Sequence, residues 1–181
     1  MDDRSHFLLM ANYNQRMNQQ VFEAAGKLPT NELFADKGAF FGSILGTLNH
    51  ILVGDLIWLA RFSSHSSRYH SLNRLDEVAR PEQLDDLLFP ALEPLAEARS
   101  RVDSSIKAWL IDEVDGSDFI RSLSYRDTKG VLSERNFGEL LSHLFNHQTH
   151  HRGQVTTLLS QQGIDVGVTD FLLEIPDRQA H

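Results

Sequence analysis

Residues 142–154 read S-H-L-F-N-H-Q-T-H-H-R-G-Q and place four histidines within nine positions. These histidines are His143, His147, His150 and His151. Apolar residues recur around them at the spacing of one helix face, namely Leu140, Leu141, Leu144, Phe145, Val155, Leu158 and Leu159. At about 100° per residue, the four imidazoles fall on one side of that helix. The stretch predicts a long amphipathic helix on which titratable side chains are more concentrated than in any other part of the chain.

The four histidines differ in how far they point toward the apolar face. With His143 set at zero, the apolar residues span roughly 60° to 200° around the helix. His147 falls near 40° and His151 near 80°, at the edge of the apolar stripe, whereas His150 falls near −20°. The pair His147 and His151 is therefore predicted to face the interior, one turn apart and close enough to hold one cation. The alternative is a polar helix face whose histidines bind backbone groups or water.

Length and charge limit the class of protein. The chain has 181 residues, 41% of them hydrophobic, which predicts one globular domain over residues 1–181. Its formal net charge is −8, from 17 basic and 25 acidic residues. Nucleic acids and anionic membrane surfaces attract basic proteins, so we expect neither as a partner. A small-molecule substrate is expected instead.

The chain contains no cysteine, which excludes disulfides and any metal site built from thiolates. Any bound metal must be held by His, Asp, Glu or carbonyl oxygen, and any thiol in a reaction must arrive on a small molecule. The acidic start at residues 1–4 does not resemble a signal peptide, and polar residues interrupt the apolar run at 40–62. We therefore expect a cytoplasmic protein without a membrane span.

Four segments have the length and apolar spacing of long helices. They cover residues 3–27, 41–62, 92–114 and a last segment that follows a cap at Ser133 or Asn136 and ends at 162–163. Four long helices joined by short connections are typical of a four-helix bundle, so the predicted fold is all-α.

The remaining segments are shorter. Residues 118–133 contain two short apolar runs around a turn with Gly130, which predicts a small β-hairpin or an extended excursion before the last long helix. Residues 167–173 predict a short closing helix. The connection at 30–38 is polar, and residues 63–73 are interpreted as a surface loop. His65 and His70, which belong to that loop, are not expected to have a specific role.

The helix at 41–62 is apolar on nearly every side except for one polar seam. Thr47, His50, Gly54 and Arg61 lie along this seam at helical spacing. A single histidine in such a position is often a core residue satisfied by hydrogen bonds. A facing helix with a histidine pair nevertheless needs a third metal ligand, and His50 is the best-placed candidate.

Other polar residues are also expected inside the bundle. Asp55 lies in the same apolar helix and needs a partner, for which a histidine N–H or an arginine is expected. The first helix carries Asn12, Tyr13, Asn14 and Asn18. Asparagine is a mediocre helix former, so this density indicates either side-chain hydrogen bonding within the bundle or a solvated face.

The chain resembles the DinB/YfiT-like family along nearly its whole length. The matching motifs, in chain order, are Ala11-Asn12-Tyr13-Asn14 with Asn18, Leu48-Asn49-His50 through Asp55, Trp58-Leu59-Ala60-Arg61-Phe62, Leu141-Ser142-His143 through Asn146-His147, His150-His151-Arg152-Gly153-Gln154, and Thr169-Asp170-Phe171-Leu172. The motif of the last helix is the most specific.

This resemblance implies a four-helix bundle in which His50, His147 and His151 hold one divalent metal. It also implies a homodimer, and relatives in the family include transferases and isomerases that depend on low-molecular-weight thiols. Zinc or nickel is favoured, while manganese, cobalt and copper also accept neutral imidazole ligands.

Two main functional hypotheses follow. In the first, the protein is a metal-dependent enzyme, a thiol-dependent S-transferase or a hydrolase, whose open coordination position activates a small thiol or water. Asp55, Glu139 and His143 are candidates for supporting groups around the metal ligands. In the second, the protein is a non-catalytic bundle that binds a metal or ligand in a stress response. A third hypothesis, in which the histidines are structural and bind no metal, is disfavoured by the histidine motif of the last helix.

Overall fold

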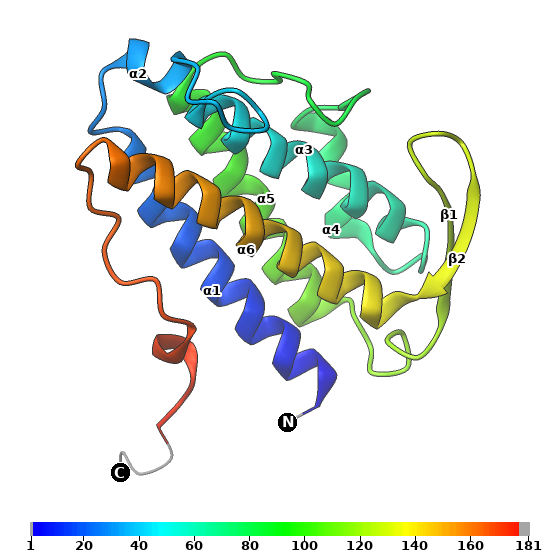
Figure 1. Ribbon diagram of the computed structural model, residues 1–181. Coiled ribbons are helices and arrows are strands. Elements are labelled where there is room, and N and C mark those ends of the chain that lie inside the picture. Colours follow the sequence, from blue (N-terminus) through cyan, green and yellow to red (C-terminus); the bar gives the residue numbers. More distant parts are fainter. Residues whose placement is uncertain (1, 178–181) are drawn as a thin grey trace.

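A computed structural model describes residues 2–177 as a bundle of four long helices that lie side by side (Figure 1). These helices are α1 (Asp3–Ala25), α3 (Ile44–Ser63), α5 (Leu92–Asp112) and α6 (Phe137–Gln161). Helix α1 packs against α5 and α6, and α3 packs against α6. The predicted all-α four-helix bundle is confirmed, and its apolar core contains residues from all four helices.

A small hairpin precedes the last helix, as predicted. Strand β1 (Ser122–Arg126) pairs antiparallel with β2 (Leu132–Asn136), in a register that places Ser122 opposite Asn136. The hairpin projects from one end of the bundle, beyond the start of α6 (Figure 1). Because β2 runs directly into α6, the hairpin is attached to the helix that carries the histidines.

Short helical turns occupy the two segments for which the sequence predicts connections or loops. They are α2 (Thr30–Phe34) and α4 (His70–Asn73), and the 3-10 helix η1 (Arg74–Glu77) follows α4 directly. Leu33 in α2 and Leu72 in α4 are buried, so each turn anchors its segment to the bundle through one apolar side chain. His70 is exposed, in agreement with its predicted place on the surface.

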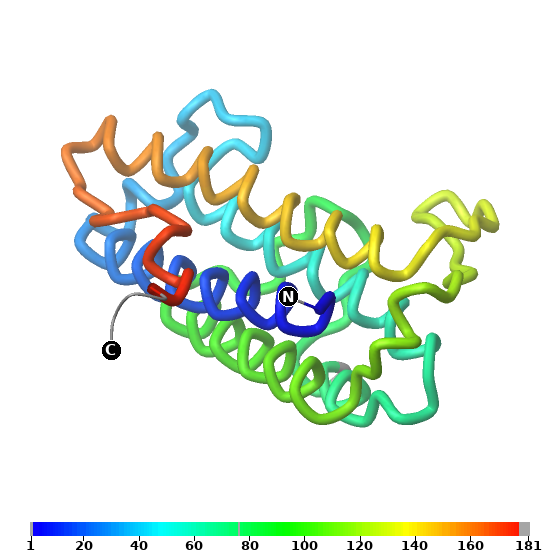
Figure 2. Tube along the Cα trace, turned by 90° about the horizontal axis from the view of Figure 1, so that it is seen from below, coloured from blue at the N-terminus to red at the C-terminus, as the bar shows by residue number. Residues whose placement is uncertain are grey.

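The C-terminal segment folds back along α1 and includes a predicted short helix. The turn is the 3-10 helix η2 (Phe171–Glu174), which starts four residues later than the helix expected at residues 167–173. Figure 2 shows this segment lying alongside α1. The Tyr13 hydroxyl donates a hydrogen bond to the Thr169 carbonyl at 2.9 Å, and the Tyr13 ring contacts Phe171 edge-on.

Local backbone chemistry explains where the two histidine-bearing helices begin. Helix α3 starts at Ile44 and not at the predicted residue 41, because Gly42 has a φ of 71° that is incompatible with a helix. Ser43 then caps α3 by accepting a hydrogen bond from the Gly46 N–H at 3.0 Å. Of the two predicted caps of α6, the structure selects Asn136, which accepts from the Glu139 N–H at 2.9 Å.

The prediction that His65 is a surface-loop residue is wrong. Its side chain is buried, and its ring stacks on Phe137 with 4.2 Å between the ring centroids. Its Nε2 lies 3.2 Å from the carbonyl oxygen of Asp118. Tyr69 and Trp109 pack edge-to-face beside it, so the loop folds onto an aromatic cluster that the serine-rich sequence of the segment does not reveal.

A network of buried polar side chains crosses the centre of the bundle. Its members come from all four long helices and are at most 3% exposed, namely Asn14, Asn18, Asp55, Arg99, Asp103, Gln148 and Arg152. Arg99 donates to Asp55 and pairs with Asp103 at 2.9 Å, while Arg152 donates to Asn14. Asp55 therefore has an arginine partner, and Asn14 and Asn18 form hydrogen bonds within the bundle and are not solvated.

None of the helices described over residues 2–177 is long and apolar enough to cross a membrane. The most apolar of them, α3, is buried by its neighbours within the bundle.

Candidate metal centre

Three histidines from two helices meet at the contact between α3 and α6. The Nε2 atom of His50 lies 3.1 Å from Nε2 of His147 and 3.2 Å from Nε2 of His151. One ring nitrogen from each residue lies within 4.8 Å of the others, so the group could hold a metal ion. His50 is buried, and His147 and His151 are partly exposed, which leaves the cluster open on one side.

Gly54 allows the two helices to approach closely at this point. A Cβ atom added to Gly54 would lie 2.7 Å from Cε1 and 3.3 Å from Nδ1 of the His147 ring. Real Cβ atoms essentially never make contacts this short, so the imidazole occupies the space that any other side chain would fill. The polar seam of α3 therefore provides both the candidate ligand His50 and, one turn later, the space for His147.

Hydrogen bonds fix the tautomers of two of the rings. Nδ1 of His50 donates to the carbonyl oxygen of Leu84 at 2.7 Å, and Nδ1 of His151 donates to the Gln154 side-chain oxygen at 2.8 Å. A carbonyl oxygen can only accept, so both Nδ1 atoms carry the proton and both Nε2 atoms present a lone pair. The Nδ1 atom of His147 is buried and has no hydrogen-bond partner among the residues that the structure describes.

Two facing lone pairs repel each other unless a positive charge lies between them. The Nε2 atoms of His50 and His151 face one another in this way at 3.2 Å. Metal–nitrogen bonds of 2.0–2.1 Å in a tetrahedron place neighbouring nitrogens roughly 3.3 Å apart, close to the observed separations. The donor set therefore fits a divalent cation held by three imidazoles.

The electrostatic environment keeps these imidazoles neutral. The pKa of His147 is lowered to about 3, chiefly because burial disfavours the charged ring and also because His151 and His50 would carry like charges nearby. Burial is also the main cause of the lowered pKa of His50 and of His151. Only the neutral ring has a lone pair for a metal, so at neutral pH the cluster is ready to bind one without losing protons.

Phe41 covers one side of the cluster. Its ring stacks on the His50 ring with 3.6 Å between centroids and an interplanar angle of 17°, and its edge approaches His151 at 5.5 Å. Because α3 begins only at Ile44, Phe41 lies on the preceding loop and can reach across the imidazoles. The sequence does not reveal this contact, because Phe41 falls within the apolar run predicted as a helix at 41–62 and no local pattern relates it to the distant His151.

The other histidines of α6 lie outside the cluster. His143 and His150 are both exposed, in agreement with their predicted peripheral positions. The His150 ring contacts His151 edge-on at 4.8 Å, and the His143 ring lies 6.1 Å from His147. No role at the site is predicted for Gln154 from the sequence, although it follows His151 by three residues on the same helix. That spacing brings two side chains together and could have indicated the hydrogen bond between them.

The candidate supporting groups have different positions. Asp55 is fully buried and accepts a hydrogen bond from Arg99 in the central network. Within the described chain it forms no hydrogen bond with the three imidazoles, so it does not support them directly. Glu139 is exposed and lies with His143 in a groove farther along α6. Supporting hydrogen bonds come instead from a backbone carbonyl and from Gln154.

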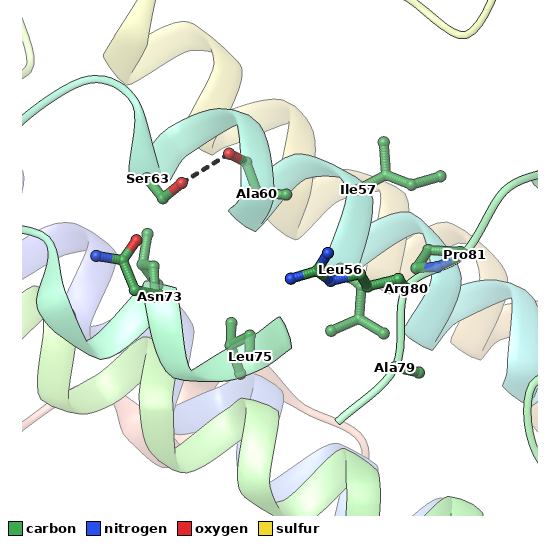
Figure 3. Close-up of a pocket in the computed structure, with 10 residues that line it drawn as sticks. Leu56, Ile57, Ala60, Ser63, Asn73, Leu75, Ala79, Arg80 and Pro81 are labelled. Carbon is green, nitrogen blue, oxygen red and sulfur yellow. Dashed lines mark hydrogen bonds between the residues drawn. The ribbon is translucent and has the colours of Figure 1, made fainter. Parts of the chain in front are cut away.

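A larger cavity lies elsewhere on α3. It has a volume of about 470 Å³ and separates α3 from the segment that contains α4, η1 and Pro81 (Figure 3). Its lining includes Leu56, Ala60 and Leu75 but no histidine. It is therefore distinct from the histidine cluster.

Comparison with known proteins identifies the family. A model of the DinB family matches residues 1–179. The Bacillus subtilis protein named Protein DinB is 27% identical over 164 residues, which cover 88% of this chain and 87% of that protein. A second Bacillus subtilis protein, the uncharacterized protein YrdA, is 43% identical over 56 residues, which cover 26% of this chain and 34% of that protein. No solved structure matches the chain significantly. Because the family model covers almost every residue, the chain belongs to the DinB family.

Proposed function

We propose that this protein is a metal-dependent enzyme that activates water or a small thiol at a divalent cation held by His50, His147 and His151. The observation that carries the proposal is the convergence of three Nε2 atoms, two of which present lone pairs to each other at 3.2 Å. A buried arrangement of this kind is unfavourable without a cation or a proton between the nitrogens.

Each residue of the site has a defined part in this proposal. The three histidines hold the cation, and the hydrogen bonds to Leu84 and Gln154 orient two of them. A cation with three protein ligands keeps a coordination position for water or thiolate and lowers the pKa of either. Phe41 excludes solvent from the face of His50, so a substrate must approach from the side on which His147 and His151 are exposed.

The chain's own composition favours a thiol that arrives on a small molecule. With no cysteine, the protein cannot supply a thiolate itself. A thiol-dependent S-transferase reaction and hydrolysis by metal-bound hydroxide both use the same open position, and both remain compatible with the three ligands. Zinc and nickel fit three neutral imidazoles better than magnesium or calcium, which prefer oxygen ligands.

A specific observation supports the non-catalytic alternative. In the part of the chain that the structure describes, no carboxylate hydrogen-bonds to any of the three histidines, and the exposed Asp85 acts on His50 only through its charge. A bundle that only binds a metal or a ligand needs no such group.

Turnover separates the two functions. The protein is loaded with zinc or nickel and is assayed with glutathione or bacillithiol and an electrophilic acceptor, and in parallel with activated esters. An enzyme gives turnover that chelation abolishes and that His147→Ala removes. Stoichiometric metal without any metal-dependent turnover in either assay would instead favour the non-catalytic bundle.

A further inference from the structure

A groove of about 340 Å³ lies on the same α3–α6 face as the histidine cluster, toward the hairpin. Its lining comes from α3, both strands of the hairpin and α6, namely Trp58, Tyr125, Arg135, Glu139, Leu140 and His143. His143 lies one helical turn before His147, and their ring centroids are 6.1 Å apart. Trp58 lies one turn after Gly54, which contacts His147. The groove is therefore about one helical turn, roughly 5 Å, from the histidine cluster along both helices.

Aromatic contacts hold one wall of the groove in place. The Trp58 ring packs against Tyr125 at 5.2 Å and against His143 at 5.1 Å, both nearly edge-on. The guanidinium of Arg61 lies 4.6 Å from the Trp58 ring and 5.1 Å from the Tyr125 ring. The hairpin is thereby attached to α3 and α6, and the groove has a preformed wall of the kind that small-molecule sites use.

A cationic and an anionic side chain, Arg135 and Glu139, line the groove and form no ion pair with each other. Arg135 at the end of β2 and Glu139 in the first turn of α6 form no ion pair with any residue of the described chain. Arg61 behind the aromatic wall also forms no ion pair within this part of the chain, and Asp127 acts on it only at longer range. A separated cation and anion beside an aromatic wall are complementary to a molecule with a carboxylate and an ammonium group.

We propose that this groove binds the amino-acid-like part of a small-molecule substrate, with Arg135 holding a carboxylate and Glu139 holding an ammonium group. This inference rests on the proposed function, since the rest of the same molecule reaches the cation at the three histidines. The substrate class is then a zwitterionic thiol or peptide-like molecule that spans about one to two helical turns, roughly 5–11 Å. Leu140 and Trp58 supply the apolar contact between the two charged groups.

Calorimetric titration of the metal-loaded protein with chemically matched probes tests this assignment. The probes are glutathione, its diethyl ester, which lacks the carboxylates, and N-acetylglutathione, which lacks the ammonium group. Arg135→Gln should weaken glutathione binding about tenfold but leave binding of the ester unchanged. Glu139→Gln should weaken glutathione binding by a similar factor but leave N-acetylglutathione unchanged. Arg101→Gln and Glu97→Gln, an exposed charge pair on α5, are the matched controls and should have no effect.

A fourth probe separates this inference from the proposed function. S-methylglutathione keeps all the charges but cannot present a thiolate to the metal. Removal of the metal should weaken glutathione binding and leave S-methylglutathione unchanged, whereas Arg135→Gln should weaken both. Equal affinity of wild type, Arg135→Gln and Glu139→Gln for every probe overturns the groove assignment, even if the metal effect is present. Loss of the metal effect alone overturns the thiol-dependent form of the proposed function and leaves the groove assignment standing.

Discussion

Gly54 determines how closely the His147 imidazole can approach helix α3. Gly54→Ala would place a Cβ atom 2.7 Å from Cε1 of His147, so the ring must rotate or α6 must move. We expect metal affinity to fall by about 10–100-fold, the range seen when groups that orient a ligand are lost. Competition with a chromophoric chelator measures this change.

Gly153 provides the matched control on α6. A Cβ atom added there would meet nothing within 4 Å, and the residue lies two positions after His151. Gly153→Ala should leave metal affinity unchanged and should stabilise the helix by about 0.5–1 kcal/mol. Wild-type affinity in Gly54→Ala would show that His147 does not depend on the close approach of the two helices.

The lowered pKa of His147 predicts how the metal-free protein responds to acid. The pKa is about 3 in the folded protein, because burial disfavours the charged ring, and near 6.5 when the chain is unfolded. Between these values the unfolded state binds more protons, so the free energy of unfolding falls as the pH drops from 6.5 toward 3. Urea denaturation at pH 7 and pH 5 measures this loss.

His147→Gln is the comparison variant for the acid response. Its neutral side chain cannot take up a proton in either state, so stability should decline less between pH 7 and pH 5 than in the wild type. The carboxylates of the protein contribute equally to both proteins and cancel in the comparison. An identical pH dependence in the two proteins would contradict the assignment of a neutral, buried imidazole.

At the scale of secondary-structure elements, the buried polar network and the histidine cluster share adjacent residues. Gly54 precedes Asp55, His147 precedes Gln148, and the ligand candidate His151 precedes Arg152. Neighbouring residues on a helix point about 100° apart, so one side of the α3–α6 contact carries the histidines and the adjoining side carries the network. The network therefore fixes the rotation of both helices and, with it, the direction of the imidazoles.

Arg99 is the residue on which this network most depends. Its guanidinium pairs with both Asp55 and Asp103, and Arg99→Met would leave two buried carboxylates without their cation. We expect a loss of about 3–5 kcal/mol in the free energy of unfolding. Arg101→Met, two residues later and 64% exposed, should change it by less than about 0.5 kcal/mol. Equal urea midpoints for the two variants would show that the network does not stabilise the bundle.

The sequence predicts helices better than it predicts contacts between distant residues. The last helix, the peripheral positions of His143 and His150 and the hairpin follow from local spacing, and the structure confirms them. The start of α3 could not be predicted at the residue level, because it depends on a positive φ at Gly42. The hydrogen bond to Leu84 and the contact of Phe41 join segments that are far apart in the chain, and no local pattern encodes them.

At the scale of the whole molecule, the family resemblance predicts a homodimer. Large apolar side chains remain exposed on the single chain, including Phe40 at 87%, Ile120 at 79% and Leu172 at 71%. Burial of such side chains between two copies would stabilise association. Sedimentation equilibrium should give twice the 20.6 kDa mass of one chain, with little dependence on salt. A single-chain mass at all concentrations would rule the dimer out.

The most direct test of the proposed metal centre is metal stoichiometry across five single variants of its histidines, measured by elemental analysis of the purified proteins. His50→Ala, His147→Ala and His151→Ala should each lose most of the metal, since each removes one of the three converging Nε2 atoms. His143→Ala and His150→Ala should retain close to one metal per chain. Metal-free wild-type protein, or an empty site in His150→Ala with a full site in His151→Ala, would contradict the proposed centre.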